Sequence, residues 1–274
     1  MLNKFVFCIS FFCIGSASAF SLNSRYAMVV EDGSNKVLYE KNADVVAPIA
    51  SLTKLMTAMV ILDRKQDMNE KIAIDAADVD NLKHSVSHVP VGAELPRHEV
   101  LQLALMSSDN RAAASLARTY PGGITAFLRA VQEKAKVLGM RHTVIEEPTG
   151  LSPHNTSTAS DLVRMATAAA RYPEIADITT DSSDLIQINH RQVKFRNTNQ
   201  LVGKKGWDIL LSKTGFTNEA GKCLIMRFKH GGKNATLVLL NAQASSSRFL
   251  DAVNIRRLIS KPSLVAGQTQ PLVR

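Results

Sequence analysis

The segment from Pro48 to Asp63 places a lysine at the head of an almost entirely apolar stretch. Nearly every side chain from Leu55 to Leu62 is apolar, which predicts a helix that is buried on all sides. Such a helix needs a large core around it, and a chain of 274 residues is long enough to supply one. Lys54 would then be buried at the start of this helix, which is costly unless a function requires the lysine.

Strand patterns lie near both ends of the chain, and helical patterns lie between them. The predicted strands are Tyr26–Val30, Lys36–Glu40, Ile209–Lys213, Lys222–Phe228 and Ala235–Asn241. The predicted helices are Ser51–Arg64, Arg97–Met106, Arg111–Tyr120, Ile124–Leu138, Asp161–Arg171 and Arg248–Ser260. This order predicts an α/β fold of the α+β type, in which a mainly antiparallel sheet is built from both termini. Helices flank the sheet, and a helical lobe is inserted at about residues 70–172.

The first residues have the pattern of a cleaved secretory signal. Lys4 precedes an apolar run from Phe5 to Ile14, and Ala17-Ser18-Ala19 matches a cleavage site. We expect residues 1–19 to be a signal peptide, 20–260 to form one domain and 261–274 to be a flexible tail. The alternative is a retained anchor, but the apolar run is about half of the roughly 20 residues that span a bilayer. We therefore expect a periplasmic protein with no membrane anchor after signal cleavage.

Charge and metal-ligand patterns exclude several classes of function. The net charge is +9, but the basic residues are scattered and aromatic content is only 5%, which argues against nucleic acid as a partner. His98-Glu99 begins like the zinc motif H-E-x-x-H, but Gln102 stands in place of the second histidine. Cys223 lies in a predicted strand and is expected to be a small core residue. The sequence predicts neither a metal nor another cofactor.

Three short motifs combine hydroxyls with lysines. They are Ser51-x-x-Lys54, Ser108-Asp109-Asn110 and Lys213-Thr214-Gly215. Average residue usage predicts S-x-x-K and S-x-N about once each by chance in such a chain, and K-T-G in about one chain in twenty. Helix residues three apart lie on one face, so Lys54 can reach the Ser51 hydroxyl. A lysine that burial keeps neutral can remove the serine proton and activate it as a nucleophile.

The three motifs resemble the active site of the penicillin-recognising serine transferases, which include D-alanyl-D-alanine peptidases and serine β-lactamases. Four longer stretches resemble the D-alanyl-D-alanine endopeptidases among the low-molecular-mass penicillin-binding proteins: PIASLTKLMTAMV, LALMSSDNRAAASLA, EPTGLSPHNTSTASDL and LSKTGFTNEAGKCLIM. The resemblance extends over roughly residues 26–260. It implies the penicillin-binding and β-lactamase type of fold.

The resemblance also implies roles for the catalytic residues. Ser51 matches the acylated nucleophile and Lys54 its general base. Ser108 matches the serine that passes a proton to the leaving amine, and Asn110 matches the residue that positions Lys54 and the substrate amide.

The last motif matches the substrate-binding strand. Lys213 and Thr214 match residues that hold the substrate carboxylate, and Gly215 matches the residue that lets the substrate backbone approach. The backbone N–H groups of Ser51 and Phe216 would form the oxyanion hole.

The resemblance implies a hydrolase that cleaves D-alanyl-diaminopimelate cross-links of peptidoglycan through a Ser51 acyl-enzyme and is acylated by β-lactams as covalent inhibitors. A D-Ala-D-Ala carboxypeptidase is an alternative, because a carboxylate lies beside the scissile amide in both substrates. The 59 residues after Gly215 leave no room for the extra domain and anchor of the family's membrane-tethered carboxypeptidases, which favours the endopeptidase.

Two further alternatives are a serine β-lactamase and a non-catalytic penicillin sensor or scaffold. Glu146 and Glu147 lie where lactamases place a deacylating glutamate, but the pattern E-x-x-L-N is absent. A non-catalytic relative is expected to lose its nucleophile or base, and Ser51 and Lys54 are both present.

Overall fold

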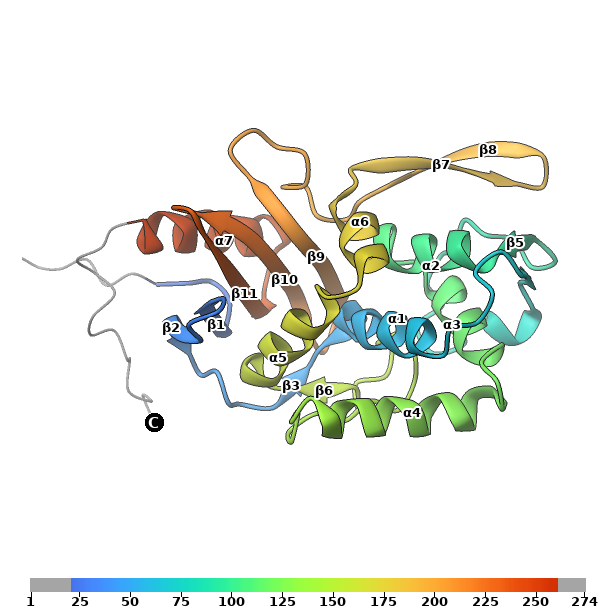
Figure 1. Ribbon diagram of the computed structural model, residues 1–274, viewed down its shortest axis with the longest axis horizontal. Helices are drawn as coiled ribbons and strands as arrows, with labels where there is room; N and C mark the ends of the chain where they lie inside the picture. The colour runs from blue at the N-terminus through green and yellow to red at the C-terminus, as the bar shows by residue number, and fades with distance from the viewer. Residues whose placement is uncertain (1–20, 261–274) are drawn as a thin grey trace, which may run out of the picture.

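A computed structural model describes residues 21–260 (Figure 1). The predicted signal peptide, residues 1–19, and the predicted flexible tail, residues 261–274, lie outside the described residues. No helix within the described part is long and apolar enough to cross a membrane.

The centre of the fold is a five-stranded antiparallel sheet whose strands come from both ends of the chain. The strand order is β2-β1-β11-β10-β9, so β9 is an edge strand. The strands are β1 (Tyr26–Glu31), β2 (Lys36–Lys41), β9 (Asp208–Thr217), β10 (Gly221–His230) and β11 (Lys233–Ala242). β1 pairs with β11, with Tyr26 opposite Leu240. This arrangement confirms the predicted fold class.

Helices cover both faces of the sheet. α5 (Ala159–Ala169) packs against β1, β10 and β11, and α7 (Ser245–Ile259) packs against β10 and β11. Side chains of β11 alternate between the two cores, since Val238 lies in one hydrophobic cluster and Leu237 in the other. Burial on both faces explains why this strand reads as an almost continuous apolar run.

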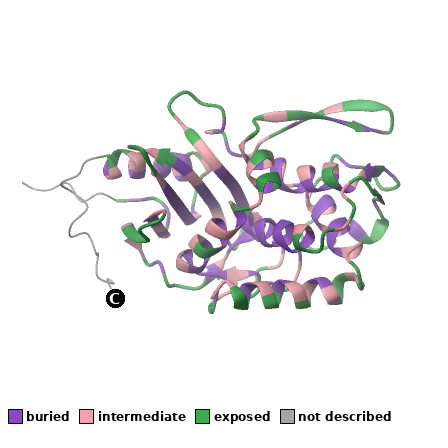
Figure 2. Ribbon diagram, viewed as in Figure 1, coloured by how far each residue is buried: buried purple, intermediate pink, exposed green. Residues whose placement is uncertain are grey.

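The apolar helix singled out in the sequence is α1 (Thr53–Asp63), and it lies in the middle of the molecule (Figure 1). Every residue from Thr53 to Ile61 is buried (Figure 2). α1 contacts α5 and four other helices, namely α2 (Arg97–Met106), α3 (Asn110–Arg118), α4 (Gly123–Val137) and α6 (Pro173–Thr180). Neighbours on every side explain why α1 has no polar face.

The first turn before α1 differs from the predicted helix start. Residues Ala50–Leu52 form a 3₁₀ turn, η1, and the α-helix begins at Thr53. Ala50 has a φ of 47°, which is a left-handed conformation that is rare outside glycine. Ser51 therefore lies in a tight turn just ahead of the helix.

The sequence patterns did not predict α6 or the hairpin of β7 (Ser183–Ile188) and β8 (Arg191–Arg196), which projects from the upper edge in Figure 1. The hairpin turn uses Asn189 and His190, both at positive φ, without the glycine that usually marks such turns. The remaining short elements are β3 (Ala47–Pro48), β4 (Lys71–Ala73), η2 (Ala76–Asp78), β5 (Glu94–Pro96) and β6 (Thr156–Ser157), of which β3 pairs with β6 and β4 with β5.

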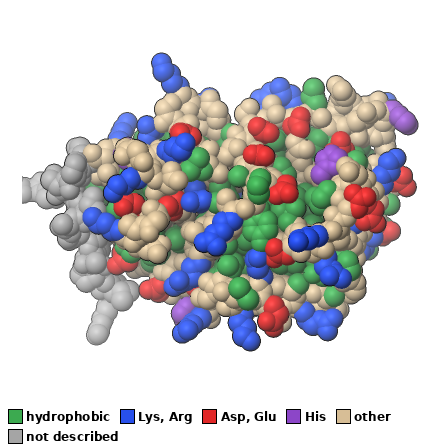
Figure 3. Space-filling model, viewed as in Figure 1, with side chains coloured by type: hydrophobic (Ala, Val, Ile, Leu, Met, Phe, Trp, Pro, Cys, Tyr) green, Lys and Arg blue, Asp and Glu red, His purple; other side chains and the backbone are tan. Residues whose placement is uncertain are grey.

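The distribution of surface charge and the position of Cys223 agree with the sequence analysis. Figure 3 shows lysine and arginine side chains spread over the visible face, with acidic side chains between them. Cys223 is fully buried in β10, which confirms its assignment to the core.

Candidate active site

Ser51 and Lys54 face each other at the junction of η1 and α1. The Lys54 Nζ lies 3.0 Å from the Ser51 Oγ, as the spacing of three residues predicts. The Thr53 hydroxyl donates to the Ala50 carbonyl at 2.9 Å and so stabilises the strained turn that holds Ser51. The first motif therefore forms a serine–lysine pair.

Lys54 is buried and has partners from three different segments. It is 1% exposed, and its Nζ donates to the Asn110 Oδ1 at 2.6 Å and to the Thr149 carbonyl at 2.7 Å. Burial lowers the pKa of Lys54 to about 8, although nearby carboxylates, that of Glu147 foremost, oppose this shift. A fraction of Lys54 is thus neutral near pH 7, whereas an ordinary lysine is almost entirely protonated there.

The second motif connects α2 to α3, as predicted. Ser108 has a φ of 61°, and this sharp turn brings Asn110 to the first position of α3. The Asp109 carboxylate caps that helix by accepting from the Ala112 N–H at 2.9 Å. The cap fixes the start of α3, so the Asn110 amide points at Lys54.

The third motif lies on the edge strand β9. The Lys213 Nζ donates to the Ser108 Oγ at 2.8 Å and to the Thr214 carbonyl at 3.0 Å. Lys213 is 1% exposed, and burial, together with the positive charges of Lys54 and Arg248, holds its pKa well below the usual range. The contact between Lys213 and Ser108 joins the second motif to the third.

Two glycines allow the backbone of the site to pack closely. A Cβ atom on Gly150 would lie 1.9 Å from the Ala50 carbonyl oxygen, and one on Gly215 would lie 3.1 Å from the Ser51 nitrogen. Gly215 therefore lacks a side chain where the backbone of Ser51 packs against it. The resemblance implied a different reason for this glycine, namely room for the substrate backbone. Gly150, which the motifs did not single out, is the tighter of the two contacts.

Glu147 holds the loop that carries Thr149 and Gly150. Its carboxylate accepts from the Thr149 N–H at 2.7 Å, the Gly150 N–H at 2.6 Å and the Asn155 amide at 2.9 Å. The Thr149 carbonyl on the same loop is a partner of Lys54. Because its oxygens are occupied by these donors, Glu147 acts as a structural residue of the loop, which weakens the lactamase alternative.

Sequence reasoning missed residues that contact the motifs from other elements. The Arg248 guanidinium on α7 donates to the Gly215 carbonyl at 3.0 Å. The Thr214 hydroxyl lies 2.6 Å from the Thr198 hydroxyl, and the Asn110 Nδ2 donates to the Ser85 Oγ at 2.8 Å. Each comes from a segment without a motif of its own, so only the fold reveals it.

Phe216 follows the third motif on β9 and lies on the solvent side of the strand. Its side chain is 49% exposed, and the Lys222 ammonium lies 3.1 Å from the centre of its ring.

Among residues 21–260, no group of three or more His, Cys, Asp and Glu side chains is placed to hold a metal ion.

Comparison with known proteins gives consistent matches over most of the chain. The family model described as D-alanyl-D-alanine carboxypeptidase matches residues 14–244. A D-alanyl-D-alanine endopeptidase of Pseudomonas aeruginosa is 46% identical over 89% of this chain and 80% of its own length. One of Escherichia coli is also 46% identical, over 89% of this chain and 79% of its own length.

Solved structures agree with these sequence matches. The Streptomyces K15 DD-transpeptidase superposes with a TM-score of 0.82 at 25% identity, covering 87% of this chain and 97% of that one. A D-alanyl-D-alanine carboxypeptidase from Mycobacterium tuberculosis gives a TM-score of 0.79 at 25% identity, covering 89% of this chain and 94% of that one. The chain therefore belongs to the D-alanyl-D-alanine carboxypeptidase family of serine peptidases.

Proposed function

We propose that Ser51 is the nucleophile and Lys54 the general base of a DD-peptidase reaction that passes through an acyl-enzyme. The observation that carries this proposal is the buried pair itself, with the Lys54 Nζ 3.0 Å from the Ser51 Oγ and the pKa of Lys54 lowered to about 8. A pKa this low leaves on the order of a tenth of the molecules neutral at pH 7. Serine needs such a base to become nucleophilic.

The contacts of Lys54 serve both charge states, since the ammonium donates to the Ser51 Oγ, the Asn110 Oδ1 and the Thr149 carbonyl, and the neutral amine can keep the last two. A neutral amine has two N–H donors and one lone pair. Two acceptors surround Nζ besides Ser51, namely the Asn110 Oδ1 and the Thr149 carbonyl. If the two N–H groups serve these acceptors, the lone pair points at the Ser51 hydroxyl and can accept its proton. Asn110 and Thr149 thereby orient the base.

Ser108 is placed to deliver a proton to the leaving amine. Its oxygen accepts from the Lys213 Nζ at 2.8 Å, so its own hydroxyl hydrogen is directed elsewhere. When the scissile bond breaks, Ser108 donates this proton to the departing nitrogen. The proton that Lys54 took from Ser51 replaces it, so the net transfer runs from the Ser51 hydroxyl to the leaving amine. Water later releases the acyl group from Ser51.

The strand β9 would hold the substrate carboxylate. A substrate carboxylate would favour the protonated form of the buried Lys213, so Lys213 would offer it a positive charge and Thr214 a hydroxyl donor. Arg248 supports the strand through the Gly215 carbonyl. The backbone N–H groups of Ser51 and Phe216 would stabilise the developing oxyanion. The close packing of Gly215 on Ser51 supports this arrangement, since it brings the two N–H groups to one place.

The proposed substrate is a peptidoglycan cross-link, with a D-alanyl carbonyl attacked and a diaminopimelate amine released. Support comes from the two relatives at 46% identity, which are named D-alanyl-D-alanine endopeptidases. The same acylation chemistry would make β-lactams covalent inhibitors. Such a substrate places the enzyme in the periplasm, with residues 1–19 removed and Phe20 as the first mature residue; N-terminal sequencing of exported protein tests this start.

Intact-mass spectrometry with benzylpenicillin tests the acyl-enzyme. We expect the wild-type protein to gain one penicillin adduct that maps to Ser51 and persists for an hour, and Ser51→Ala to gain none. Rapid consumption of penicillin without a stable adduct would instead indicate a β-lactamase. Protein and penicillin that both remain unchanged would refute the proposed active site.

Digestion of defined muropeptides distinguishes the two peptidase activities. An endopeptidase converts cross-linked dimers to monomers and leaves monomeric pentapeptides intact, whereas a carboxypeptidase trims the terminal D-alanine of the pentapeptide. We expect the first result.

A further inference from the structure

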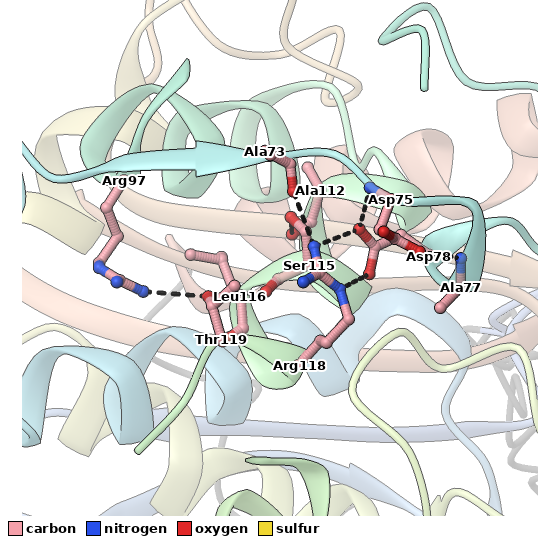
Figure 4. Close-up of polar contacts among 10 residues, drawn as sticks. All are labelled: Ala73, Asp75, Ala77, Asp78, Arg97, Ala112, Ser115, Leu116, Arg118 and Thr119. Atoms are coloured by element: carbon pink, nitrogen blue, oxygen red, sulfur yellow. Dashed lines mark hydrogen bonds and ion pairs between the residues drawn. The ribbon is translucent and has the colours of Figure 1, made fainter. Parts of the chain in front are cut away.

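The loop from Val79 to Val89, here called the rim loop, is anchored at its start to the helix that carries Asn110. It follows η2, whose last residue, Asp78, is 3% exposed. Arg118 of α3 donates to both oxygens of the Asp78 carboxylate, at 2.8 Å and 2.9 Å (Figure 4). The beginning of the rim loop is therefore fixed relative to α3.

Beyond this anchor, the rim loop contacts the active site through two serines. The Ser85 Oγ accepts from the Asn110 Nδ2 at 2.8 Å, which leaves the Asn110 Oδ1 for Lys54. The Ser87 hydroxyl donates to the Asp109 carboxylate at 2.8 Å. A shift of the rim loop would thus alter the orientation of the Asn110 amide.

Apolar burial contributes little to holding the tip of the rim loop. Leu82 is 65% exposed and Val86 is 85% exposed. The tip is instead ordered by polar contacts, among them the Asp80 carboxylate, which accepts from the backbone N–H groups of Lys83 and Ser85. The position of the rim loop therefore depends strongly on each polar contact that the loop makes with the rest of the protein.

One such contact connects the rim loop to the opposite side of the site. Lys83 forms an ion pair with Glu219, which lies in the turn between β9 and β10. The two side chains are 33% and 37% exposed, so the pair is partly shielded from water. β9 carries Lys213, and the rim loop contacts Asn110, so the pair joins the two segments that flank Ser51.

We propose that Lys83 and Glu219 form a clasp that positions the rim loop and, through Ser85, the Asn110 amide against Lys54. The inference rests on the proposed function of Ser51 and Lys54. Both residues of the clasp are positioning residues, because neither contacts the reacting atoms in this structure. With the clasp closed, Asn110 holds the Lys54 amine toward Ser51; with the clasp open, the loop and the amide lose one support.

A charge swap separates the clasp from general effects of surface charge. Lys83→Glu and Glu219→Lys each place like charges together, and we expect each to slow acylation by benzylpenicillin about 3- to 10-fold. The double variant restores an ion pair with reversed polarity, and we expect its rate to lie within about 2-fold of the wild type. The loss should appear in the acylation rate constant at saturating penicillin, because the clasp orients the base.

The matched control is the ion pair of Lys233 and Glu31, which joins β11 to β1 away from the three motifs. Lys233→Glu and Glu31→Lys change the same charges, and we expect the wild-type acylation rate for both. Thermal unfolding of all variants shows that they are folded.

Two results would overturn the clasp. One is a wild-type acylation rate in both single variants at the clasp. The other is a double variant that is as slow as the single variants. Failure of the wild-type protein to react with penicillin would refute the proposed function and, with it, this inference.

Discussion

Replacing Gly150 with alanine tests how closely the Glu147 loop supports the nucleophile. Gly150 has a φ of +86°, and its added Cβ would meet the Ala50 carbonyl oxygen at 1.9 Å. A left-handed conformation costs an alanine about 1–2 kcal/mol, and relief of the overlap by a backbone shift costs about 1–3 kcal/mol more. We expect the free energy of unfolding to fall by roughly 2–5 kcal/mol in total.

Gly33→Ala is the matched control for this substitution. Gly33 has nearly the same φ, +85°, but nothing lies within 4 Å of the added Cβ. Only the conformational cost of about 1–2 kcal/mol applies there. Replacing glycine with alanine also reduces the conformational entropy of the unfolded chain, and this effect is the same in both variants, so it cancels in the comparison. The difference between the two variants therefore measures the overlap at Ala50.

Urea unfolding and penicillin acylation give the two readouts. Because the overlap moves the peptide that leads into Ser51, we expect Gly150→Ala to acylate about a hundredfold more slowly, while Gly33→Ala keeps the wild-type rate. Equal loss of stability in the two variants, together with a wild-type acylation rate in Gly150→Ala, would refute the close packing of Gly150 on the Ala50 carbonyl.

The acylation rate should rise as pH increases through about 8, because burial lowers the pKa of Lys54 to this value and only the neutral amine accepts the serine proton; a rate that is flat from pH 6 to 9 would argue against Lys54 as the base. Arg118→Met leaves the buried Asp78 carboxylate without its positively charged partner and should lower the free energy of unfolding by about 1–3 kcal/mol. Lys229→Met, at an exposed ion pair, should change it by less than about 1 kcal/mol. Equal effects of the two substitutions in urea unfolding would contradict this difference. Cys223 is buried, and burial raises its pKa to about 11, so the native protein should react with a thiol reagent only on unfolding, and rapid labelling of the native state would show that the strand opens.

The sequence was sufficient to predict the helices and strands whose surroundings are the same along their whole length. α1 is apolar on every side because helices surround it, and β11 is apolar on both faces because a helix covers each face. An apolar run of this kind therefore predicts both the type of element and its burial. The projecting hairpin of β7 and β8 was missed because its turn lacks glycine and one face is exposed, so neither the turn nor the burial gives a strong signal.

The residues of the candidate site also fall into a group that the sequence predicts and a group that only the structure reveals. The motifs identified Ser51, Lys54 and Lys213, since the chemistry needs these residue types at fixed local spacings. Gly150 and Ser85 act through contacts with distant segments, and nothing in their local sequence marks those contacts. The roles of all these residues remain predictions until the variants are measured.

Pairing of β1 with β11 delays completion of the sheet until the end of synthesis. β1 can pair with β2 early, but Tyr26 also lies opposite Leu240, so nearly all the described chain must be made before β1 gains its second neighbour, β11. Ser51, Asn110 and Lys213 likewise meet only after the helical segments and β9 are both in place. Long-range pairings of this kind fold slowly. β11 joins β1 to β10 and so to β9, so we expect a nascent or truncated chain that lacks β11 to lack the assembled site. Reaction with penicillin would then report completed folding as well as activity.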